Sequence, residues 1–367
     1  MKNKRMESLQ LLRAIAFLCI FTSHLGINYF GGIGVEVFLV LSGFLMFYNY
    51  AGKDVVQHYS IKDAVLFSKS KIEKLYGLHI VMLIVAIPFL VLYNIKKKYS
   101  IYKMITKLLL NIFLIQSWIP IEEYRYSMNN LSWYLCVCAF VYFLFPYIKY
   151  ILLDKRVNVH RVIVSTIILI VLQILVGLSV QKYFVDPQWV QGLTYNSPLY
   201  RTIDFIVGCN IAYIYMNVSQ IKKFLEKNAT IMELVSAVIV IVTEVLVYKI
   251  WNIEKLMWMK NTVILIPATC FVLLVFVTGK GLVLRKLLSV KWLLQIGNLS
   301  AYAYLIHELV IRYINFILSR LMGIQSNIYI AFVVGLIAFV ITMIMATGWK
   351  KIKEINYEAS KSKKYKA

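Results

Sequence analysis

Acidic residues and cysteines are scarce in this sequence. Its 367 residues include 17 Asp and Glu against 40 Lys and Arg, and only 5 cysteines. All five cysteines lie within apolar stretches, so a secreted disulfide-stabilised scaffold is excluded. G-x-S-x-G, Walker, G-x-G-x-x-G and H-E-x-x-H motifs are absent, which removes the hydrolase, nucleotide-binding and zinc-protease classes that depend on them. Cys136 and Cys138 have no second donor pair at metal-ligand spacing, so the chemistry is predicted to be metal-independent.

Apolar residues, by contrast, dominate the chain. They make up 60% of it, more than the core of a soluble protein of this size can bury. They gather into stretches close to the length of about 20 residues that a helix needs to cross a bilayer. The sequence therefore predicts an all-α, polytopic helical bundle. The candidate stretches are 9–28, 31–50, 75–95, 104–119, 131–153, 161–180, 199–216, 230–251, 260–278, 297–317 and 326–349.

The net charge of +23 would suggest a nucleic-acid partner in a soluble protein. Here most of the basic residues lie in short segments that join apolar stretches, where the positive-inside rule expects them on the cytoplasmic side. The charge therefore indicates membrane topology, and no nucleic-acid partner is expected. The basic segments are the N-terminus, 51–74, 149–161, 217–228, 279–291 and 350–367.

Both termini are predicted to be cytoplasmic, which requires an even number of crossings. One of the eleven stretches must therefore fail to span. We assign this role to 104–119, the shortest stretch, as a re-entrant or surface helix, which leaves about ten transmembrane helices. This assignment places the five lysines between 96 and 107 on the outer side, which the positive-inside rule disfavours. An open alternative is therefore that 75–95 is the stretch that does not span.

The domain organisation is expected to be simple, because the chain shows no internal repeat and no linker. Residues 1–349 are predicted to form one transmembrane domain and residues 350–367 a basic cytoplasmic tail. Arg13 and His24 interrupt the first apolar stretch, and no signal-peptidase cleavage site follows it. We therefore expect this stretch to remain as the first helix.

Ionisable side chains inside the apolar stretches are the strongest indication of function, because each costs about 2.5–3.5 kcal/mol to insert. Arg13 and His24 are eleven residues apart, which is three helical turns plus about 20°, so both project from one helix face. Arg13 is predicted to lie in the cytoplasmic half and His24 in the outer half. An arginine that only reaches for lipid headgroups is the alternative for Arg13.

A glycine-rich hairpin follows His24 and places Glu36 at a similar depth in the second apolar stretch. An imidazole beside a carboxylate forms an acid–base unit, because the carboxylate orients the ring and the free ring nitrogen takes a proton from a hydroxyl. We therefore predict that His24 is a general base and that Glu36 is its partner. A His–Glu pair that only holds two helices together is the alternative.

Further polar residues recur within the membrane. Arg201 and Asp204 are three residues apart and able to pair. Tyr304 and His307 share one face of the tenth stretch, a pattern that helix packing also produces. Taken together, the ionisable residues gather from the middle of the membrane outward, which predicts a site in that region.

The order of these residues resembles the membrane acyltransferase-3 family over nearly the whole chain. The hallmark of the family, an arginine and a histidine separated by ten residues in the first helix, is matched by Arg13 and His24. The glycine-rich hairpin of the family and its Ser-Gly-Phe stretch are matched by Gly34, Glu36, Phe38, Ser42, Gly43 and Phe44. Weaker matches are Ser132, Trp133, Pro146, Arg201, Phe205, Gly208, Ser300, Tyr304, Leu305 and His307.

One motif departs from the family pattern. Where the family tends to carry Arg-x-x-Arg and then Tyr-Pro before the third helix, this chain has Lys71, Lys74, Tyr76 and Gly77. Lysine offers a positive charge to the phosphates of CoA but lacks the bidentate geometry of arginine. The resemblance implies that Arg13, Lys71 and Lys74 serve the acyl donor. Ordinary positive-inside charge is the alternative for the two lysines.

The resemblance implies an O-acyltransferase of a bacterial plasma membrane, with the acyltransferase domain at 1–349. It would move an acetyl group from acetyl-CoA, without a metal, to a hydroxyl of a cell-surface or lipid-linked carbohydrate. His24 and Glu36 would be catalytic, and the site would be shaped by Arg201, Asp204, Tyr304 and His307.

The expected partners are acyl-CoA, a carbohydrate acceptor and membrane lipids. Either the chain completes the reaction alone or a separate extracytoplasmic partner does. A transporter or flippase of a glycan or small polar substrate is the alternative function, because buried charges also line transport pathways.

Overall fold

The computed structural model describes residues 2–56, 59–260, 262–324 and 327–366, and every regular element in this part of the chain is helical. The prediction of an all-α protein is confirmed. The main helices are α1 (Lys2–His24), α2 (Gly31–Tyr50), α3 (Ile61–Lys97), α6 (Ser132–Leu152), α7 (Val159–Tyr183), α9 (Pro198–Asn217), α11 (Ala229–Ile250), α13 (Leu265–Thr278), α15 (Lys291–Phe316) and α16 (Ile328–Lys366). Shorter helices are α4 (Ile101–Ile112), α5 (Glu122–Arg125), α8 (Pro187–Thr194), α10 (Ser219–Lys227), α12 (Met257–Lys260) and α14 (Leu282–Leu288), with 3-10 turns at Gln116–Trp118 and Glu254–Leu256 and a π-helical turn at Ile317–Leu321.

Polar residues determine where several of these helices begin. Ser60 Oγ accepts a hydrogen bond from the backbone N–H of Asp63 at 3.1 Å at the start of α3. Asn158 caps α7 in the same way. Pro198 follows the N-cap Ser197 at the start of α9, where its missing N–H leaves no bond unmade. Local sequence therefore positions the apolar helices along the chain.

Seven segments of the described chain are long and apolar enough to cross a membrane: Gly31–Tyr50, Ile61–Lys97, Ser132–Leu152, Val159–Tyr183, Ala229–Ile250, Glu254–Thr278 and Ile328–Glu358. α1, α9 and α15 are also at least 20 residues long. They carry the ionisable residues Arg13, Arg201 and His307, which make them less apolar. If these three helices also cross, the count is ten. That count and the cytoplasmic position of both termini stay predictions.

The fourth apolar stretch forms α4, whose 12 residues span only about 18 Å and cannot cross a core of about 30 Å. α4 folds back along α3, since the carbonyl of Asn111 lies 2.9 Å from His79 Nε2 and the Tyr76 hydroxyl donates to the carbonyl of Ile112 at 3.0 Å. The third stretch, by contrast, lies within the 37 residues of α3. The structure thus favours 104–119 as the stretch that does not span.

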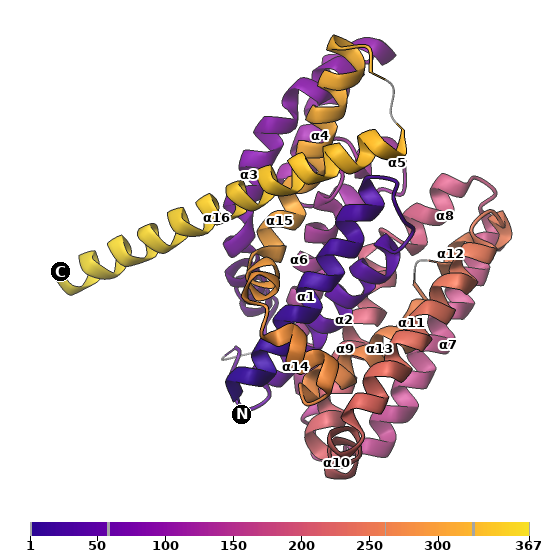
Figure 1. Ribbon diagram of the computed structural model, residues 1–367, viewed down its shortest axis with the longest axis vertical. Coiled ribbons are helices and arrows are strands. Elements are labelled where there is room, and N and C mark those ends of the chain that lie inside the picture. The colour runs from indigo at the N-terminus through magenta and orange to yellow at the C-terminus, as the bar shows by residue number, and fades with distance from the viewer. Residues whose placement is uncertain (1, 57–58, 261, 325–326, 367) are drawn as a thin grey trace.

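α1, α2, α9 and α15 form the centre of the bundle, with α2 packed along α9 and α1 packed along both α2 and α15. α3 and α6 pack together on one side, and α7, α11 and α13 lie on the other side (Figure 1). α16 packs against α15 and then extends beyond the other helices (Figure 1). It continues without a break to Lys366, so no helix end marks the predicted boundary between 349 and 350. The division into domain and tail stays a prediction.

The outer helices expose rows of large apolar side chains. Ile167 and Leu175 on α7, Ile241 on α11 and Leu336 on α16 are more than half exposed. Apolar surface of this extent is stable when lipid surrounds it. These helix faces therefore fit a multi-pass membrane protein.

Two glycines allow α2 and α9 to pack closely. A Cβ at Gly208 of α9 would overlap the backbone of Val40 and Phe44, and a Cβ at Gly43 of α2 would overlap the backbone of Phe205. Small residues at such crossings let helix backbones approach each other within a membrane.

Replacement of Gly208 by alanine is therefore expected to lower the free energy of unfolding by about 1–3 kcal/mol, because the added methyl group overpacks the crossing. The matched control is Gly348→Ala in α16, where a Cβ meets no atom within 4 Å. Thermal unfolding of the detergent-solubilised protein measures both. Equal melting temperatures for the two variants would contradict the close packing described here.

Candidate active site

His24 lies at the end of α1, where its ring contacts the ring of His307 on α15. The two ring centroids are 5.2 Å apart, with the planes at 78°. His307 is fully buried, and its Nδ1 lies 3.1 Å from the carbonyl oxygen of Ala303. Because a carbonyl only accepts, Nδ1 carries the proton, and Nε2 of the neutral ring is left as an acceptor. Nε2 has no hydrogen-bond partner among the described residues.

Glu36 does not contact His24 in the described structure, contrary to the predicted pairing. Its Oε2 lies 2.9 Å from the guanidinium of Arg201, and both side chains are fully buried. The reason is electrostatic, because a buried carboxylate is stabilised best by a full opposite charge held at hydrogen-bond distance. The side chain beside His24 is His307.

Arg201 and Asp204 pair as predicted, with 3.0 Å between the guanidinium and the carboxylate. Gln173 of α7 donates a hydrogen bond to Asp204 at 2.8 Å. Together with Glu36, this buried cluster joins α2, α7 and α9. It lies behind the site, since the guanidinium carbon of Arg201 is 5.7 Å from the ring of Tyr195, which lines the His24 cavity.

The His24 cavity has a volume of about 250 Å³. His24 is exposed to solvent, so its ring is accessible to a ligand. Aromatic side chains form much of the lining, among them Trp133, Tyr195, Trp251 and Tyr304. This arrangement places an accessible imidazole in a largely aromatic cavity.

A second cavity, of about 170 Å³, contains two of the predicted donor-binding residues, Arg13 and Lys71. Arg13 makes no ion pair among the described residues, and its buried Nε has no hydrogen-bond partner there. Lys71 Nζ donates to the Tyr50 hydroxyl at 2.6 Å. Lys74 is exposed and lies outside the lining, so the structure brings Arg13 and Lys71 together without it.

Tyr304 lines both cavities. Its ring centroid lies 6.1 Å from that of His307, on the side of the His24 cavity, and 5.3 Å from that of Tyr134, which lines the Arg13 cavity. The buried Tyr304 hydroxyl has no hydrogen-bond partner among the described residues. The two cavities therefore meet at one side chain that carries an unused polar group.

The tyrosines of the Arg13 cavity were not predicted from the sequence. Tyr134 and Tyr142 line it together with Cys138, and the Tyr142 hydroxyl is hydrogen-bonded to Ser42 Oγ at 2.9 Å. These three residues of α6 are spaced by four, which places them on one helix face. That spacing was the available signal, but it is weak in a chain with 26 tyrosines.

Comparison with known proteins matches this chain to a protein family. The acyltransferase-3 family, described as an acyltransferase domain, matches residues 6–347. O-acetyltransferase OatA of Staphylococcus aureus (strain NCTC 8325 / PS 47) is 24% identical over 320 residues, which cover 83% of this chain and 50% of OatA. Acyltransferase MdmB of Streptomyces mycarofaciens is 25% identical over 236 residues, which cover 57% of each chain. No solved structure matches.

The chain thus spans about half the length of the curated relatives that it matches. The family match covers nearly all of this chain, and it includes both cavities and His24. The protein belongs to the acyltransferase-3 family.

Proposed function

We propose that this protein is an O-acyltransferase of a bacterial plasma membrane that moves an acetyl group from acetyl-CoA to a hydroxyl of a cell-surface or lipid-linked carbohydrate. The observation that carries the proposal is the pair of cavities that meet at Tyr304, one with Arg13 and Lys71 and the other with His24. A reaction between two substrates that approach from different sides needs such a junction. Family membership identifies the reaction class as acyl transfer.

The Arg13 cavity is proposed to receive the thioester end of acetyl-CoA. At about 170 Å³ it has no room for the nucleotide, which would remain at the entrance near Lys71. Lys71 supplies a positive charge for the phosphates, and the deeper Arg13 offers N–H donors to the thioester carbonyl. Donors aimed at that oxygen stabilise the negative charge that develops during acyl transfer.

His24 is proposed to act as the general base. It takes a proton from the acceptor hydroxyl while the hydroxyl oxygen attacks the thioester carbonyl, and the C–S bond then breaks to release CoA. His307 would position the His24 ring from the buried side. Glu36 would act through Arg201 on the packing of α2 against α9.

Replacement of His24 by alanine is expected to lower kcat by about 10²- to 10⁴-fold, the usual contribution of a general base. The matched control is His160→Ala, since His160 is exposed and lines neither cavity. Transfer of label from radiolabelled acetyl-CoA to a glycan fraction by the purified protein measures both variants. Parental turnover in the folded His24 variant would show that the base has been assigned to the wrong residue.

Lys71→Ala is expected to raise KM for acetyl-CoA by about tenfold with little change in kcat, because it removes one charged contact to the donor. Lys74→Ala should change KM much less, since Lys74 lies outside the cavity lining. Lys62→Ala, at an exposed position of α3, serves as the control for a loss of cytoplasmic charge. Equal effects of all three substitutions on KM would contradict a specific role for Lys71.

Arg201→Met is expected to lower the free energy of unfolding by about 3–5 kcal/mol, because Glu36 and Asp204 lose their buried counter-charge. The triple variant Arg201→Met, Glu36→Gln, Asp204→Asn removes all three charges and should recover much of this loss. Thermal unfolding and kcat per folded molecule are measured together. A stable Glu36→Gln variant that loses only kcat would instead contradict a purely structural role for this cluster.

A further inference from the structure

A third cavity, of about 710 Å³, lies beside the His24 cavity. It is formed by the ends of α3 and α15 together with α5 and the first residues of α8. Tyr126 and Asn130 line both this cavity and the His24 cavity, so the two adjoin each other. Ligand sites in proteins commonly measure about 300–1,000 Å³. The His24 cavity, at about 250 Å³, holds a small group, whereas its neighbour has room for a larger molecule.

Aromatic, polar and charged side chains together line this cavity. Phe89, Tyr93 and Phe316 offer aromatic surface, while Glu122 and Gln188 offer a carboxylate and an amide. A sugar ring presents C–H groups on its faces and hydroxyls around its edge, so it can contact aromatic faces and hydrogen-bond to polar groups at the same time. A wholly apolar ligand would leave the polar groups unpaired.

Part of the charge around this cavity is paired within the protein, whereas Lys96, Glu122 and Arg320 line it without an ion pair among the described residues. Glu123 pairs with Lys103 at 2.9 Å and with Lys107 at 2.7 Å. Burial raises the pKa of Glu123, but hydrogen bonds from the two lysines outweigh it and leave the pKa below its ordinary value. Arg312 forms a bidentate pair with Glu308, in which Nε donates to Oε1 at 3.1 Å and Nη2 donates to Oε2 at 2.8 Å. The free charged groups can hydrogen-bond to the hydroxyls of a sugar, since a hydroxyl both donates and accepts.

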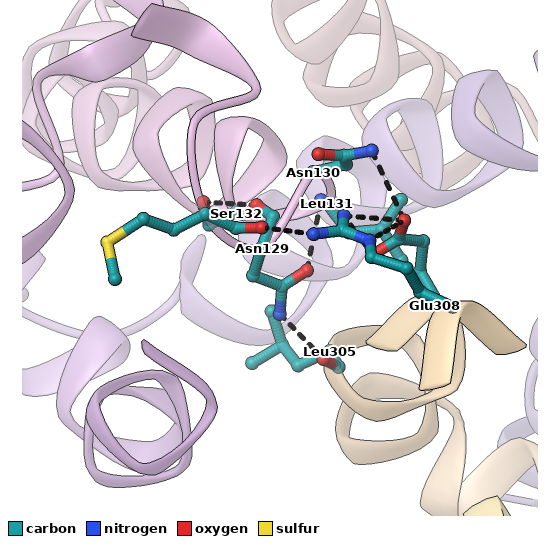
Figure 2. A network of polar contacts seen from close by, with 8 residues as sticks. Asn129, Asn130, Leu131, Ser132, Leu305 and Glu308 are labelled. Atoms are coloured by element: carbon teal, nitrogen blue, oxygen red, sulfur yellow. Dashed lines mark hydrogen bonds and ion pairs between the residues drawn. The ribbon is translucent and has the colours of Figure 1, made fainter. Parts of the chain in front are cut away.

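The boundary between the two cavities is held in place by hydrogen bonds. Asn130 Nδ2 donates to Glu308 Oε1 at 3.2 Å, and Figure 2 shows Asn130 directed towards Glu308. The hydroxyl of Tyr126 donates to Asn196 Oδ1 at 3.0 Å. Side chains fixed in this way keep the boundary between the cavities in one shape, which lowers the entropic cost of binding.

We infer that the 710 Å³ cavity binds neighbouring sugar units of a glycan chain, while the unit to be acetylated enters the His24 cavity past Tyr126 and Asn130. The inference rests on the proposed O-acyltransferase function. It assigns recognition of the acceptor to α3, α5 and α15 and leaves the chemistry to His24. Glu122 and Tyr93 would then bind the glycan without contacting the reacting hydroxyl.

The test uses the full-length protein in detergent and fluorescently labelled cellotetraose, chitotetraose and maltotetraose. Tyr93→Ala and Glu122→Gln are expected to weaken binding of the preferred tetrasaccharide by about tenfold each. The matched controls are Tyr183→Ala and Glu254→Gln, which change exposed residues outside the cavity. A dodecyl glycoside of the same tetrasaccharide shows whether the natural glycan is lipid-linked. Tighter binding of the glycoside indicates a lipid-linked glycan, whereas equal binding of the two compounds indicates a free glycan chain.

Release of CoA from acetyl-CoA by the parent protein in the absence of any glycan is measured in parallel. Failure of the parent protein to bind any of the three tetrasaccharides, or equal binding by cavity and control variants, overturns the inference. Failure of the parent protein to consume acetyl-CoA would instead count against the proposed function. The two readouts therefore separate an error in the acceptor site from an error in the reaction.

Discussion

The structure depends on one constraint: a charged side chain within a bilayer must be paired or must face a cavity. Arg201 meets this constraint by pairing with Glu36 and Asp204, and the cluster fixes the packing of α2, α7 and α9. Arg13 and His24 form no ion pair among the described residues, and each lines a cavity. Pairing thus separates the charges that stabilise the bundle from those that are accessible to a ligand.

The helices, and the position of Arg13 and His24 within one of them, could be predicted from the sequence, because apolar length and helical spacing are local properties. The partner of Glu36 could not. The position of Glu36 in its apolar stretch predicts a depth in the membrane similar to that of His24. It does not predict which side chain from a distant segment will contact Glu36. Arg201 lies 165 positions further along the chain and provides a full charge, so it outcompetes a neutral imidazole for the buried carboxylate.

The segment between α3 and α6 shows a second limit of sequence patterns. The lysines of this segment are predicted to lie on the outer side, which the positive-inside rule disfavours. Lys103 and Lys107, however, both pair with Glu123, which offsets part of their charge. Asn111 at the end of α4 is buried and donates to Ser127 at 2.7 Å, while Ser132 donates to Asn111 at 3.0 Å. These polar contacts hold the fourth apolar stretch against the bundle, which agrees with the prediction that this stretch does not cross the membrane.

The junction at Tyr304 also bears on the choice between an enzyme and a transporter. A transporter has to pass its whole substrate across the membrane, which requires a pathway that opens to each side in turn. An acyltransferase of the proposed kind passes only an acetyl group, because CoA and the acceptor return to the sides from which they came. The two cavities measure about 170 and 250 Å³ and meet at a single tyrosine. This arrangement suits the transfer of an acetyl group better than the passage of a whole substrate. A narrow junction also limits the entry of water, which would otherwise compete with the acceptor hydroxyl for the thioester.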